Sequence, residues 1–131
     1  MKFKKILLKE PDTPNVNGII FSKEAIESIH NQIQLKKGKL LGELGQTNVS
    51  EIVCMKDAKL VVTDSHIENN KLYVDIELLD LPNSGQLIEL IKSEMLVVGG
   101  RYTAKLNENN EVDENISIHA IDLIAKEDTL K

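Results

Sequence analysis

Apolar and polar residues alternate most regularly between positions 71 and 79. Leucine, valine and isoleucine occupy every second position there, and the residues between them are tyrosine, aspartate and glutamate. Period-two alternation predicts a half-buried β-strand. A similar run at 59–67 precedes it, with Asn69-Asn70 between the two runs, so we expect a β-hairpin. The residues that define the alternation are Leu72, Tyr73, Val74, Asp75, Ile76, Glu77 and Leu78.

Two other segments follow the period of an amphipathic helix. Ser22 is suited to cap a helix over 23–37, whose apolar stripe is Ile26, Ile29 and Ile33, and Gly38 ends it. A second helix is expected over 84–94, capped by Asn83 or Ser84. Its expected buried face consists of Leu87, Ile88, Leu90 and Ile91.

The remaining apolar runs read as strands at 2–9, 96–106 and 116–124, and the proline-containing stretch 10–18 reads as a loop. We therefore predict a single α+β domain over 1–131, with a mostly antiparallel sheet or partly closed β-barrel and two main helices. Sequence gives no oligomeric state.

Charge and composition narrow the function classes. The net charge of −5 disfavours nucleic acid as a partner, since binding phosphates needs basic residues. No run reaches the roughly 18 apolar residues of a membrane span, so we expect a soluble protein. The single cysteine, Cys54, provides neither a disulfide framework nor a zinc cluster.

The three histidines show no catalytic or metal-binding spacing. We interpret His30 as a helix-surface residue and His66 and His119 as strand residues, none near a second type of metal ligand. Ser65 and His66 are adjacent in a strand and so face opposite sides, which separates them as nucleophile and base. We expect no metal and no cofactor.

Five short motifs resemble, in order over 12–124, the prohead (head-maturation) serine proteases of tailed phages, whose fold is related to herpesvirus assemblin. Asn15-Val16-Asn17-Gly18 resembles the entry to the first helix of that family, and Gly42-Glu43-Leu44-Gly45-Gln46 resembles Gly-Glu-Leu-(Gly/Asp)-His-Pro. Leu79-Asp80-Leu81-Pro82 resembles the turn before the second helix. Val97-Val98-Gly99-Gly100-Arg101-Tyr102 resembles the nucleophile motif Gly-Val-Ser-Ser-Arg-Gly, and Ile121-Asp122-Leu123-Ile124 resembles the closing strand.

The resemblance implies that the catalytic residues are missing. Gln46 stands at the histidine of the motif, and Gly99 and Gly100 stand at its two serines. Neither glutamine nor glycine supplies a base or a nucleophile. We expect Gln46 and Gly99-Gly100 to lie close together as a degenerate site, and Arg101 to form a surface or strand ion pair.

The resemblance therefore favours a non-enzymatic auxiliary or decoration protein of the phage capsid, made in the bacterial cytoplasm, that binds the major capsid protein or other head proteins. Lysines of the N-terminal strand are the expected contacts, because they oppose the acidity of the chain. An alternative is an active or regulatory prohead protease, using Ser65, Ser84, Ser93 or Ser117 with His66 or His119. The four lysines are Lys2, Lys4, Lys5 and Lys9.

Overall fold

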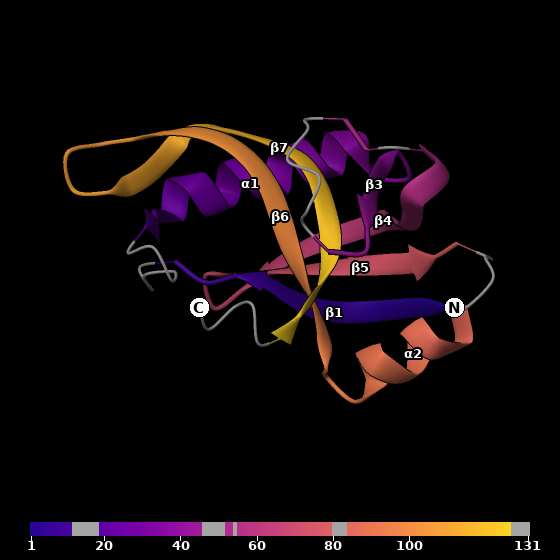
Figure 1. The fold of residues 1–131 in the computed structure, drawn as a ribbon. Helices are drawn as coiled ribbons and strands as arrows, with labels where there is room; N and C mark the ends of the chain where they lie inside the picture. The colour runs from indigo at the N-terminus through magenta and orange to yellow at the C-terminus, as the bar shows by residue number, and fades with distance from the viewer. Residues whose placement is uncertain (12–18, 46–51, 54, 80–83, 127–131) are drawn as a thin grey trace.

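The computed structural model describes residues 1–11, 19–45, 52–53, 55–79 and 84–126. Within these ranges the chain forms strands, two α-helices and one 3₁₀ turn (Figure 1). In chain order they are β1 (Lys2–Lys9), β2 (Ile20–Phe21), α1 (Lys23–Lys36), β3 (Leu40–Glu43), η1 (Met55–Asp57), β4 (Ala58–Glu68), β5 (Lys71–Leu78), α2 (Ser84–Lys92), β6 (Leu96–Leu106) and β7 (Glu111–Ala125).

The strands form two sheets. One has the order β1-β5-β4-β3 and the other β2-β7-β6. All neighbours are antiparallel except β2 with β7. Past the end of β3, Leu44 makes a parallel bridge to Leu123, which links the sheets. The predicted α+β class is confirmed, with two sheets in place of a closed barrel.

Helix α1 is built as its sequence predicts. The Ser22 hydroxyl accepts a hydrogen bond from the Ala25 amide at 3.1 Å, and the isoleucine stripe is buried. That stripe packs against β7 of one sheet and β4 of the other, so one helix face covers both sheets. The helix ends at Lys36, one residue before the predicted boundary.

Helix α2 is shorter and less buried than predicted. It ends at Lys92. Glu94 has a left-handed φ of 60°, which is incompatible with a right-handed helix. Leu87 is buried, whereas Ile88 and Ile91 only partly cover the core. The expected cap Asn83 lies outside the described residues. No helix among those described is long and apolar enough to cross a membrane.

The predicted hairpin is confirmed as β4 and β5. Asn69 and Asn70 have φ values of 52° and 65°, as a two-residue type I′ turn requires. The apolar members of the β5 alternation are all buried. The pairing of β4 with β5 shifts register between Val62 and Asp64, so Asp64 lies directly opposite Asp75.

Candidate functional site

The structure brings the ends of three motif segments together. In the ladder of β6 with β7, Gly99 lies opposite Asp122 and Gly100 opposite Ile121. The segment after β3 joins them, because the Gly45 amide donates to the Leu123 carbonyl at 2.6 Å. Gln46 follows Gly45 but lies outside the described residues, so its expected proximity to Gly99-Gly100 stays a prediction.

At this junction Arg101 is held by two carboxylates. Its Nε and Nη2 each donate to one oxygen of Asp122 at 2.8 Å, and Nη2 also reaches Glu43 Oε2 at 2.5 Å. The Glu43 amide donates to Asp122 Oδ1 at 2.9 Å. Glu43, Arg101 and Asp122 are 6%, 8% and 0% exposed. The network therefore ties β3, β6 and β7 together inside the protein.

The environment of Arg101 corrects part of its predicted role. It forms an ion pair on a strand, as expected, but the pair is buried and not on the surface. Hydrogen bonds from its guanidinium to Asp122, and then to Glu43, raise the pKa of Arg101 above its ordinary value although burial opposes them. Its donors are directed at carboxylates of the chain itself, which is a structural use of a bidentate guanidinium.

Tyr102 fills the space beside Gly100. A Cβ built on Gly100 would collide with the Tyr102 ring and hydroxyl, because residues two apart on a strand share one face. The ring packs edge-on against Phe21, with 5.3 Å between centroids. Burial raises the pKa of the Tyr102 hydroxyl. A serine at position 100 would therefore require the Tyr102 ring to move.

The Tyr102 hydroxyl is buried and has no hydrogen-bond partner within the part of the chain that the structure describes. An unsatisfied buried hydroxyl is destabilising, so Tyr102→Phe should raise the free energy of unfolding by about 1 kcal/mol. Urea denaturation measures the difference. Tyr73→Phe is the control, because the Tyr73 hydroxyl is not a buried atom without a hydrogen-bond partner, and it should change little. A loss of stability in Tyr102→Phe alone would show that the hydroxyl has a partner.

A serine and a histidine do meet elsewhere, against expectation. His30 Nδ1 lies 2.8 Å from Ser65 Oγ, which also accepts from Gln34 Nε2 at 2.9 Å. His30 is thus half-buried against β4 and not a helix-surface residue, and burial lowers its pKa. The distance between Ser65 and His30 is within the reach of a nucleophile and its base. Ser65 is, however, only 3% exposed.

The other candidate serines and histidines have local roles. The Ser84 hydroxyl donates to the Leu79 carbonyl at 3.0 Å, and the Ser93 hydroxyl donates to the Leu90 carbonyl at 3.2 Å. His119 Nε2 lies 2.6 Å from Thr103 Oγ1 on the neighbouring strand. As alternation predicts, Ser65 and His66 face opposite sides, since Ser65 meets α1 whereas His66 meets Asp75 on β5.

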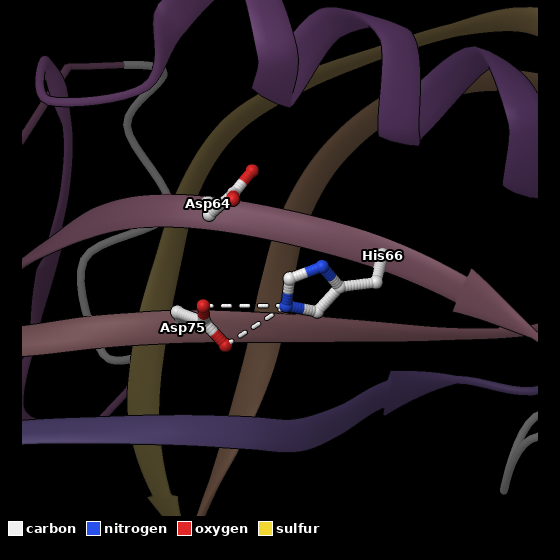
Figure 2. A group of neighbouring side chains, drawn as sticks. All are labelled: Asp64, His66 and Asp75. Carbon is white, nitrogen blue, oxygen red and sulfur yellow. Dashed lines mark hydrogen bonds and ion pairs between the residues drawn. The ribbon is translucent and has the colours of Figure 1, made fainter.

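The surroundings of His66 contradict the expectation that no histidine lies near a carboxylate or cysteine that could bind the same metal. One ligand atom each of Asp64, His66 and Asp75 lie within 4.8 Å of one another. Figure 2 shows the His66 ring reaching Asp75, with Nε2 3.2 Å from both oxygens, while the Asp64 carboxylate points toward α1. Such a set suits a divalent metal. Each carboxylate already has protein donors, Gln34 Nε2 for Asp64 and the Lys5 amide for Asp75.

The four lysines of β1 are not equivalent. Lys2, Lys4 and Lys5 are exposed, and Lys5 Nζ pairs with Glu68 at 2.7 Å. Lys9 lies partly buried with Nζ 4.2 Å from the Phe21 ring centroid, and burial lowers its pKa. Of the predicted partner-binding lysines, Lys9 is therefore directed at the protein itself.

Among solved structures, the chain superimposes on the bacteriophage T4 capsid assembly protease, gp21, with a TM-score of 0.78. The match covers 94% of this chain and 80% of that chain at 16% sequence identity. The fold is similar to that of a phage capsid assembly protease. No protein-family model and no curated protein matches the sequence. At 16% sequence identity, the similarity to the capsid assembly protease concerns the fold alone.

Proposed function

We propose that this chain is a non-enzymatic structural protein of a phage, an auxiliary or decoration protein that binds the major capsid protein. The fold, shared with a capsid assembly protease, supports a role in the phage head. The packing at Gly100 is the observation that carries the non-enzymatic part. Tyr102 fills the place that a side chain at position 100 would need.

The chemistry of serine proteases explains why this packing matters. Such an enzyme needs a hydroxyl to attack the peptide carbonyl and an imidazole to accept the proton. Gly99 and Gly100 carry no hydroxyl, and Gln46 carries no basic nitrogen. The Arg101 guanidinium is occupied by Glu43 and Asp122 inside the protein. A protein that keeps the fold but lacks the nucleophile and the base can still act by binding other proteins through its surface.

One contact favours the alternative, an active or regulatory protease that acts in capsid maturation. The His30–Ser65 hydrogen bond has the length that a nucleophile and its base require. It lies between α1 and β4, and the buried Ser65 hydroxyl also accepts from Gln34. A substrate carbonyl would have to displace this packing to reach it, so we rank this function second.

A peptidase assay tests the proposal. The purified chain, incubated with fluorescent casein and with purified head proteins, should release no fragments above a protein-free blank, since the buried Ser65 hydroxyl cannot reach a substrate carbonyl. A fluorophosphonate probe, which labels activated serines, should leave it unlabelled. Fragments or labelling that disappear in Ser65→Ala and in His30→Ala would instead support the protease alternative.

A further inference from the structure

A groove runs along β1, and Tyr73 of the neighbouring strand β5 also lines it. Its wall is formed by residues 3–10, by Ile91 and Lys92 of α2, and by the first part of β6, and its volume is about 790 Å³. Figure 1 shows β6 crossing β1, and α2 lying beside the N-terminal half of β1 on the side opposite β5. Both β1 and β6 are the last strands of their sheets. The groove thus lies between two sheet edges.

The groove has an apolar floor and a basic rim. Leu96, Val97 and Val98 of β6 line it together with Leu7, which is 39% exposed. Around them the groove contains five lysines and only two glutamates, although the whole chain has a net charge of −5. Lys5 pairs with Glu68 and Lys9 lies over the Phe21 ring, so the positive charge of the rim comes mainly from the other three lysines. The lysines are Lys4, Lys5, Lys9, Lys92 and Lys126, and the glutamates are Glu10 and Glu94.

The shape of β1 restricts what can pair with it. Its register with β5 shifts between Phe3 and Ile6 and again between Leu7 and Lys9, and Lys5 has a φ of 58°. Bulges and lysines on an edge strand discourage pairing with arbitrary strands. An acidic strand is the exception, because its charges are complementary to those of the groove.

We propose that this groove binds an extended segment of a partner protein in which acidic side chains alternate with apolar ones. The backbone of the segment adds to the β1 edge, its apolar side chains meet Leu7 and Val97, and its carboxylates meet Lys4 and Lys92. Specificity comes from charge and β-strand addition, and not from a deep pocket.

This inference rests on the proposed function for its biological setting, since it names the kind of segment a head protein would present. Its test does not. Peptide binding to the isolated chain is independent of peptidase activity and of particle composition, so the groove proposal and the non-enzymatic proposal can fail separately.

The probe is a fluorescent octapeptide of alternating glutamate and valine, matched in length to the eight residues of β1. Fluorescence anisotropy should show that it binds at least about tenfold more tightly than an octapeptide of alternating lysine and valine, because like charges repel. A glutamate–valine peptide with two central prolines should lose binding, because proline lacks the amide donor that strand addition uses.

Variants locate the site. Lys4→Glu combined with Lys92→Glu should weaken binding of the glutamate peptide about tenfold by reversing two rim charges. The control combines Lys39→Glu with Lys105→Glu, which reverse two exposed lysines outside the groove. This pair should leave affinity within about twofold at about 0.15 M salt, where charges more than about 8 Å apart are largely screened. Circular dichroism verifies that all four substitutions keep the fold.

Amide chemical shifts identify the strand that is used. Saturable binding of the glutamate peptide, with shifts concentrated in residues 3–10 and 96–98, is the expected result. Equal affinity for the two charged peptides, shifts centred elsewhere, or no saturation would overturn the proposal. A dimer that the double variant converts to a monomer, without peptide binding, would show that a second copy occupies the groove and would also overturn it.

Discussion

Replacing Arg101 by methionine should lower the free energy of unfolding by about 3–5 kcal/mol, the usual cost of breaking a buried ion pair by removing one partner. Two carboxylates, Glu43 and Asp122, would then face each other without a cation, and both are almost fully buried. Urea denaturation followed by circular dichroism measures the loss. Arg101→Lys keeps the charge but not the two parallel donors to Asp122, so it should lose less.

The stability lost in Arg101→Met should depend on pH in a defined direction. In Arg101→Met, each buried carboxylate would have a raised pKa, because burial and a like charge both disfavour ionisation. A group with a raised folded-state pKa stabilises below its unfolded pKa and loses that contribution as pH rises. The deficit of Arg101→Met should therefore shrink as pH falls from about 7 toward about 4.

Lys105→Met is the matched control for Arg101→Met, because Lys105 is an exposed cation on the same strand. Its free energy of unfolding should change by no more than about 0.5 kcal/mol. If Arg101→Met costs no more than this control, or if its deficit grows on acidification, the Arg101 network does not hold β3, β6 and β7 together.

Substituting Gly42 by alanine should be similarly damaging. A Cβ at Gly42 would run into the backbone carbonyl of Ile121, which no rotamer change can move aside. Either β3 or β7 must shift, and Glu43, the next residue, would lose its alignment with Arg101. We expect a loss of about 3 kcal/mol or more in the free energy of unfolding, measured as above, because overpacking against backbone strains a whole strand.

Gly85→Ala is also a glycine-to-alanine substitution, but it should have the opposite effect on stability. Gly85 lies in α2, and no atom from elsewhere in the described chain lies within 4 Å of the place that a Cβ would take. Alanine there should stabilise by about 0.5 kcal/mol, since it restricts the unfolded chain and favours the helix. Equal effects of the two substitutions would contradict the close approach of β3 to β7.

Local patterns in the sequence were enough to predict most of the elements. The isoleucine stripe with its Ser22 cap predicts α1, and the alternation at 71–79 with Asn69-Asn70 predicts the β4–β5 hairpin. These signals come from residues close together in the chain. The arrangement of two sheets, linked by the bridge from Leu44 to Leu123, was not predicted because it depends on contacts between distant segments.

The contacts at the candidate sites also divide into those that the sequence could predict and those that it could not. Asp64 and His66 are two residues apart on β4, a spacing of two metal-ligand types that was available in the sequence and was missed. The approach of Asp75 depends on the register shift in β4, which the sequence does not mark. The contact of His30 with Ser65 joins a helix to a strand and was equally hidden.

Motif positions quoted for the family resemblance have different structural roles. Gly42, Glu43, Arg101 and Asp122 make the close approach and ion pairs that join the sheets. At positions 99 and 100 the chain has glycines, and Tyr102 packs beside the second.

The most direct test of a structural role is the amount of intact chain in purified mature phage particles, measured by quantitative mass spectrometry against the major capsid protein. A non-enzymatic capsid protein should be present uncleaved, in a fixed ratio to the major capsid protein that is the same between preparations. Absence from mature particles, together with presence in immature heads and head-protein cleavage that depends on Ser65, would contradict the structural role and support a maturation protease.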